Sequence, residues 1–96
     1  MFVLVTYDVL TTTRPGRRRL RRVAQVCLNF GQRVQFSVFE CNLCETDLVR
    51  LRHNLLEEIN PDEDSLRLYM LGEDPSRRVE HYGQKPSQDF EDLLLI

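Results

Sequence analysis

Asp8 is the first residue of the chain whose type and position suggest chemistry. It follows an unbroken apolar run, Phe2-Val3-Leu4-Val5, and then Thr6-Tyr7. Such a run is typical of a strand that is buried on both faces and central in a sheet, so the carboxylate would stand where this strand reaches the surface. Asp8 is therefore either a cap for the loop that follows or a metal ligand or catalytic acid.

A magnesium site at Asp8 would need a second copy of the chain. Mg²⁺ is usually held by one or two carboxylates, with water and phosphate oxygens completing its octahedron. In a twofold dimer with Asp8 near the axis, two copies would supply the pair, and the metal could hold a scissile phosphate and generate hydroxide. Four further residues are candidates for this site: Tyr7, Arg33, Ser37 and Phe39. Arg33 would offset charge on phosphate oxygens and Ser37 would hydrogen-bond a phosphate, whereas Tyr7 and Phe39 are better explained by packing.

A second candidate is a run of six arginines within nine residues that contains no acid: Arg14, Arg17, Arg18, Arg19, Arg21 and Arg22. Because like charges repel, the run favours a polyanionic partner over a solvated or protein-binding face. Arginine contacts with phosphates fix position and raise affinity without reading sequence. No ladder of aromatic residues accompanies them, so a base-stacking platform for single strands is not indicated.

The charge is divided unevenly along the chain. The net charge is −2, which by itself argues against nucleic acid. Residues 1–48, however, carry seven arginines and four acids, whereas residues 49–96 carry six basic and eleven acidic residues. A polarised chain can present a basic face to a polyanion while its average is acidic.

The cysteines and histidines are weaker candidates. Cys41-x-x-Cys44 is a lone pair, and a zinc site would need two further ligands, for which His53 and His81 show no matching spacing. We interpret the cysteines as reduced thiols with packing roles. Neither histidine is placed to act as a base.

The length of 96 residues fits a single domain with a small core. A chain of this size buries only about 60–65% of the surface that its unfolded form exposes, so a dimer would help it. No apolar run approaches the ~20 residues of a membrane helix, and the first strand starts too early for a signal peptide. We expect a cytoplasmic protein that does not contact membranes.

Hydrophobic periodicity predicts two amphipathic helices between strands. Gly31 caps the first helix and Asn60-Pro61 stops the second. Val49 and Leu56 widen the apolar stripe of the second helix. A change of parity near residues 35–38 predicts a turn or bulge. The predicted elements are a strand over residues 1–8, a helix over 17–30, strands over 32–35 and 37–43, a helix over 46–59, a strand over 65–71 and a short strand over 79–82.

This order is the βαββαβ plan of a ferredoxin-like α+β fold, a four-stranded antiparallel sheet with both helices on one face. The first and third strands are central in that plan, in agreement with the apolar run at residues 2–5. We take residues 1–83 as the domain and residues 84–96 as a C-terminal tail.

Three segments resemble the CRISPR-associated adaptation proteins of the second core Cas family: residues 4–9, 31–41 and 64–69. The most specific is R-V-Q-F-S-V-F-E at residues 33–40, with Tyr7-Asp8 at the matching distance before it. The resemblance covers residues 1–83. One departure is the loop Leu10-Thr11-Thr12-Thr13, which lacks the second acid that many members carry shortly after the first.

The resemblance implies a prokaryotic antiviral protein that forms homodimers with a ferredoxin-like fold. The short strand at 79–82 would add to the partner's sheet, and Asp8 of both protomers would bind Mg²⁺ (or Mn²⁺) at the dimer axis. Tyr7, Arg33, Ser37 and Phe39 would be the neighbours of this site. The dimer would also sit between two dimers of a CRISPR integrase subunit and hold the DNA of a new spacer. The arginines that would lie along that DNA are Arg14, Arg17, Arg18, Arg21 and Arg22.

Two functions therefore remain open. The first is a metal-dependent endonuclease, an endoribonuclease on single-stranded RNA or a DNase on double-stranded DNA, with Asp8 at its site. The second is a non-catalytic DNA-binding scaffold for spacer integration. A ferredoxin-like regulatory module that binds a small ligand is a remote third. The tail ends in Leu93-Leu94-Leu95-Ile96, which we expect to dock on the partner protomer or on the integrase subunit because an exposed apolar end is a liability.

Overall fold

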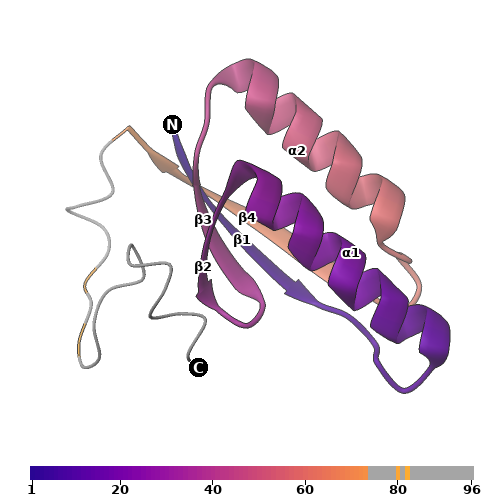
Figure 1. Ribbon diagram of the computed structural model, residues 1–96. Coiled ribbons are helices and arrows are strands. Elements are labelled where there is room, and N and C mark those ends of the chain that lie inside the picture. Colours follow the sequence, from indigo (N-terminus) through magenta and orange to yellow (C-terminus); the bar gives the residue numbers. More distant parts are fainter. Residues whose placement is uncertain (74–79, 81, 83–96) are drawn as a thin grey trace.

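A computed structural model describes residues 1–73, 80 and 82 of the chain. Figure 1 shows the described elements in chain order: β1 (Phe2–Asp8), α1 (Arg14–Phe30), β2 (Gly31–Gln35), β3 (Val38–Asn42), α2 (Glu45–Glu58) and β4 (Ser65–Gly72). This order confirms the predicted βαββαβ plan. The predicted fifth strand at 79–82, apart from Glu80 and Tyr82, and the tail at 84–96 lie outside the described residues.

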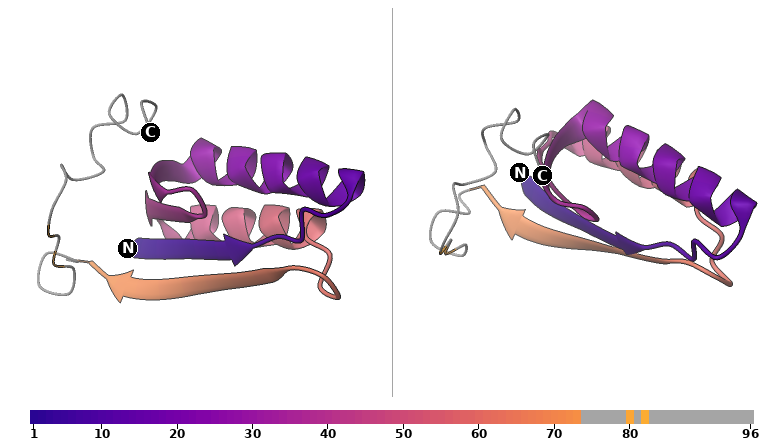
Figure 2. Two further views of the ribbon diagram at one scale, coloured as in Figure 1. Left: turned by 90° about the horizontal axis from the view of Figure 1, so that it is seen from below. Right: turned by 60° about the horizontal axis from the view of Figure 1, so that its bottom comes forward.

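The four strands form one antiparallel sheet in the order β2-β3-β1-β4. Strands β1 and β3 are central, as the apolar run predicted. Within the part of the chain described, both helices cover one face of the sheet and leave the other face open (Figure 2). Side chains alternate along β1, so that Val3, Val5 and Tyr7 are buried beneath the helices. Phe2, Leu4, Thr6 and Asp8 belong to the other face.

The core is a layer between the sheet and the two helices. Helix α1 contributes Val23 and Cys27 to this layer, and α2 contributes three buried leucines. These side chains pack against Phe39 and Cys41 of β3 and the buried residues of β1. The predicted stripe of α1 is confirmed. The α2 stripe is narrower than predicted, because Val49 and Leu56 are 60% and 56% exposed. They lie on the flank of the helix that the sheet does not reach. Neither helix offers the apolar length that crossing a bilayer requires, within the residues described.

Helix α1 begins at Arg14, three residues earlier than predicted, because Thr13 is its N-cap. The Thr13 hydroxyl accepts a hydrogen bond from the Gly16 amide at 3.1 Å, which satisfies one of the amides that a helix start leaves unpaired. Pro15-Gly16 precedes the predicted helix because a Pro-Gly pair is typical of a loop, but the missing N–H of Pro15 is no loss in the first turn of a helix. A side chain on Gly16 would collide with the Leu10 carbonyl, so the loop before the helix packs directly against its first turn.

Gly31 ends α1 in an extended conformation and starts β2 without a loop. Glycine is needed there because a side chain would collide with the Glu40 carbonyl and the Cys41 thiol of the neighbouring strand. The predicted turn is confirmed: β2 and β3 are joined by a tight turn at Phe36 and Ser37, with a register irregularity between Arg33 and Gln35.

Candidate metal and nucleic-acid site

Asp8 is the last residue of β1 and is exposed to solvent. Its strand neighbour on β4 is Ser65. Within the described ranges, neither a cation nor a hydrogen-bond donor contacts its carboxylate. At the end of this central strand, the carboxylate is open to solvent and, as far as the described residues go, available to an external cation.

Tyr7, Arg33 and Phe39 lie together on the helix-facing side of the sheet. The Tyr7 and Phe39 rings stack with centroids 6.1 Å apart, and the Arg33 guanidinium lies 5.1 Å from the centroid of Phe39. Phe39 is fully buried and Tyr7 is 6% exposed, so both rings contribute packing. The Arg33 Nε is buried and finds no hydrogen-bond partner in the described chain.

The Tyr7 hydroxyl is a donor. Burial raises its pKa, the nearby Cys27 raises it further, and Arg33 only partly offsets the two. The protonated hydroxyl donates to the Phe36 carbonyl at 3.2 Å. Tyr7 therefore holds the β2–β3 turn against β1 rather than acting as a base at neutral pH.

Ser37 lies across from Tyr7, the residue that precedes Asp8. Its carbonyl accepts a hydrogen bond from the Tyr7 amide at 3.1 Å. This bond continues the antiparallel register of β1 and β3, in which Thr6 pairs with Val38. Phe36, the other residue of this turn, is one that the sequence pattern did not single out as functional. The predicted site residues thus form two groups. Asp8 and Ser37 lie at the end of the sheet, whereas Tyr7, Arg33 and Phe39 lie under the helices.

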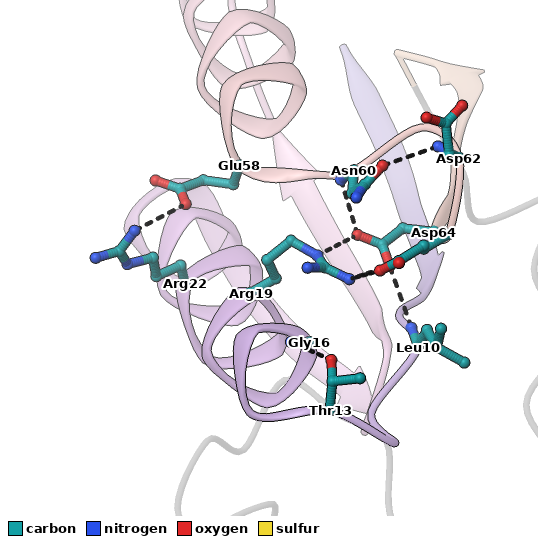
Figure 3. A network of polar contacts seen from close by, with 10 residues as sticks. Leu10, Thr13, Gly16, Arg19, Arg22, Glu58, Asn60, Asp62 and Asp64 are labelled. Atoms are coloured by element: carbon teal, nitrogen blue, oxygen red, sulfur yellow. Dashed lines mark hydrogen bonds and ion pairs between the residues drawn. The ribbon is translucent and has the colours of Figure 1, made fainter.

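One of the six clustered arginines is structural. The Arg19 guanidinium bonds Asp64 at 2.8 Å and Glu63 at 2.7 Å (Figure 3). The side chain of Asp64 is completely buried and also accepts from the amides of Leu10 and Asn60 at 3.1 and 2.8 Å. Burial alone would raise the pKa of the Asp64 carboxyl, but the bonds from Arg19 and the two amides outweigh it and hold that pKa below its usual range. This carboxylate ties together the β1–α1 loop, α1 and the α2–β4 loop.

Four other arginines, Arg14, Arg17, Arg18 and Arg21, are exposed and occupy one side of α1. Arg22 is also exposed but lies 4.0 Å from Glu58, so its charge is partly balanced. Among the described contacts, only the Arg17 guanidinium of the four has a partner, the Thr11 carbonyl at 3.2 Å. No acid occupies the first turn of α1, where the helix dipole disfavours cations. A basic cluster at that position is poorly explained by stability and well explained by an anionic partner.

The cysteines and His53 behave as packing or surface residues. Cys27 and Cys41 are buried, and burial raises the pKa of their thiols to about 12 and about 11. Cys44 is exposed at the start of α2. His53 lies on α2, 3.0 Å from Glu57, and His81 lies outside the described residues. The described chain contains no group of three His, Cys, Asp or Glu residues that could hold a metal ion.

The donors present fit half of a magnesium site. A single unpaired carboxylate offers the hard oxygen ligand that Mg²⁺ prefers, and Mg²⁺ keeps several waters and phosphate oxygens in its shell. A loop without acids, residues 9–13, follows Asp8, so this loop supplies no second carboxylate beside it.

Known proteins with similar sequences and structures identify the family of this chain. The model of the family "CRISPR associated protein Cas2" matches residues 1–79. The "CRISPR-associated endoribonuclease Cas2" of Chlorobaculum tepidum is 57% identical over 96 residues, and the "CRISPR-associated endonuclease Cas2" of Halalkalibacterium halodurans is 52% identical; both alignments cover the whole of each chain. The crystal structure of Streptococcus pyogenes Cas2 at pH 6.5 superposes with a TM-score of 0.77 at 52% identity, and covers 86% of this chain and 100% of that one.

Proposed function

Because the chain belongs to the Cas2 family of CRISPR-associated proteins, whose relatives above are named endonucleases or endoribonucleases, we propose that it is a homodimeric, Mg²⁺-dependent endonuclease on single-stranded RNA. In the same dimeric form it would join a CRISPR integrase subunit, two dimers of which would flank it, and bind the DNA of a new spacer. Residues 1–83 would form the working domain.

The observation that carries this proposal is the free Asp8 carboxylate at the end of a central strand. It is rigidly mounted, exposed and unpaired within the residues described. Asp8 of the two protomers would hold the metal between them, and water and the substrate phosphate would complete its shell. Bound Mg²⁺ supplies Lewis-acid polarisation of the phosphate and a hydroxide nucleophile.

The other residues of the chain would bind and orient the strand to be cut. The exposed arginines of α1 would hold the phosphate backbone on either side of the site. Ser37, in the turn beside β1, would hydrogen-bond a phosphate oxygen. Tyr7 and Phe39 would act through packing, because they press the β2–β3 turn against the strand that carries Asp8. Arg33 would offset charge on the phosphate if its guanidinium turns outward from Phe39.

The second candidate is a DNA-binding scaffold without catalysis. The same basic side of α1 supports it, and so does the lack of any acid in residues 9–13, which leaves one carboxylate for each protomer. A DNase on double-stranded DNA is a third form of the proposal that uses the same residues.

Asp8→Asn separates these functions. Wild-type protein is expected to cleave labelled single-stranded RNA with Mg²⁺ or Mn²⁺ and not with EDTA, and Asp8→Asn to lose roughly 100-fold or more of the rate, since even outer-shell residues of metal sites cost up to that factor. Binding of RNA and DNA should persist. The control is Asp62→Asn, which removes one exposed charge from the α2–β4 loop. If the wild type binds DNA but cuts neither RNA nor duplex DNA across pH and metal, the scaffold is the correct function.

A further inference from the structure

Phe36 has an exposed ring, but its backbone is held by hydrogen bonds. It is 74% exposed, more than any other large apolar side chain in residues 1–73. Its backbone is nevertheless held, because its carbonyl accepts from the Tyr7 hydroxyl and the next carbonyl, that of Ser37, accepts from the Tyr7 amide. Tight turns favour small polar residues or glycine, so neither turn geometry nor core packing accounts for a phenylalanine here.

The ring lies at the Asp8 end of the sheet. The pairs between β1 and β3 run from Phe2 with Asn42 to Thr6 with Val38. One step beyond, the Tyr7 amide bonds the carbonyl of Ser37, and the Tyr7 hydroxyl bonds the carbonyl of Phe36, the other residue of the turn. Asp8 follows Tyr7 directly, so the turn and the Asp8 carboxylate lie at the same end of the sheet. A nucleic-acid strand bound at Asp8 therefore has the turn that carries this ring beside it.

The surface at this end of the sheet is polar and cationic. Gln35 beside the ring is exposed and Ser37 shares its turn, and on the other side of β1 the exposed Ser65 and Arg67 of β4 pair with Asp8 and Thr6. An apolar protein–protein contact would surround the ring with further apolar side chains. A single aromatic ring with hydroxyls, an amide, a carboxylate and a guanidinium instead matches a nucleotide, which presents a flat base, a sugar and a phosphate.

We propose that Phe36 stacks on the base of the nucleotide next to the phosphate held at Asp8. This inference rests on the proposed function, because it takes that phosphate position from it. Stacking on an aromatic side chain needs a base that is out of its own stack, and it tolerates any base because each has a π-face. Phe36 is thus a binding residue that orients an unpaired nucleotide at the site.

The test is binding without metal, so that it does not depend on cleavage. A short single-stranded RNA carrying 2-aminopurine at successive positions is titrated with the full-length protein in EDTA, and both affinity and fluorescence quenching are recorded. We expect quenching at one or two adjacent positions with wild type. Phe36→Ala should lose this quenching and bind roughly 5- to 150-fold more weakly, the range for one base–aromatic stack. Phe36→Tyr should retain both, and Leu56→Ala, which changes another exposed apolar residue on α2, should match wild type.

An abasic nucleotide at the quenched position should abolish the difference between wild type and Phe36→Ala. Unchanged affinity and quenching in Phe36→Ala would overturn the proposal. So would a shift of Phe36→Ala from dimer to monomer by light scattering, since the ring would then belong to the contact with a second copy. If stacking is found but no RNA is ever cut with Mg²⁺, the proposed function fails while the role of Phe36 stands.

Discussion

Neighbouring residues at the end of β1 have opposite roles. Asp8 points to solvent without a partner in the described chain, whereas Tyr7 is buried and donates to the Phe36 carbonyl. The sequence was sufficient to predict that Asp8 ends a central strand, because an unbroken apolar run followed by an acid marks such an end. It did not predict the bond between Arg19 and Asp64, because the two are separated by 45 residues and no local pattern records which arginine of a cluster finds an acid. Phe36 was missed because the parity change predicts a turn near residues 35–38 but does not indicate whether an apolar side chain in that turn is exposed.

Asp64→Asn tests the buried network at this scale. The variant lacks the carboxylate charge that pairs with Arg19 and accepts hydrogen bonds from two amides. We expect the free energy of unfolding to fall by about 2–3 kcal/mol and the Tm to fall by roughly 10 °C or more. The pKa of the Asp64 carboxyl is lower in the folded protein than in the unfolded chain. Its contribution to the free energy of unfolding is therefore complete above the ordinary carboxyl pKa of about 4, and declines as the pH falls through the folded-state pKa. The wild-type advantage measured in urea should therefore shrink below about pH 4. Asp62→Asn, nearby and exposed, should stay within about 0.5 kcal/mol of wild type.

At the scale of elements, hydrophobic periodicity was enough for the order and type of all six described elements. It failed at the start of α1, where Pro15-Gly16 indicated a loop but the Thr13 cap starts the helix earlier. The earlier start moves Arg14 into the helix, so that four exposed arginines share one side. Periodicity also overestimated the buried face of α2, since Val49 and Leu56 show that a sheet of this width covers only part of a helix.

Replacing Arg14, Arg17, Arg18 and Arg21 together by Gln tests the basic side of α1. Each phosphate contact contributes about 0.7–0.9 to the slope of log affinity against log salt concentration, so the loss of four contacts should lower the slope by up to about 3 for single strands and about 3.6 for duplex DNA. Stability should stay equal or rise slightly, because cations near a helix start are unfavourable. Arg52→Gln on α2 is the control, with no change in slope expected. An unchanged slope in the quadruple variant would mean that nucleic acid binds elsewhere.

At the scale of the whole molecule, the sheet has one covered and one open face. The described residues leave Leu4 and Thr6 on a face without a helix, and Asp8 ends that same face. A second copy packed there would bury the apolar residues and bring two Asp8 carboxylates toward one axis. The sequence could predict the need for this partner from the small core and the lone acid, but the distance between the two carboxylates depends on the packing of the pair.

Leu4→Asp tests this arrangement. A charge in the middle of the open face should convert the dimer to monomers, as measured by light scattering, because a buried, unpaired charge is strongly unfavourable. Mn²⁺ binding followed by calorimetry should weaken as well, although Asp8 is untouched. Val49→Asp, on the exposed flank of α2, should remain a dimer. A dimer that persists in Leu4→Asp and still binds metal would show that the protomers meet through another surface.

The three cysteines have a practical consequence. Thiols react as thiolates, and the raised pKa of the buried Cys27 and Cys41 keeps both protonated at neutral pH. Cys44, exposed at the first turn of α2, is the remaining thiol of the three in the chain. The natural sequence therefore offers one attachment point for a spin label or a fluorophore on each protomer. A symmetric pair of such labels would report how far the two subunits stand apart, with and without metal or nucleic acid, in a protein that needs no engineered cysteine.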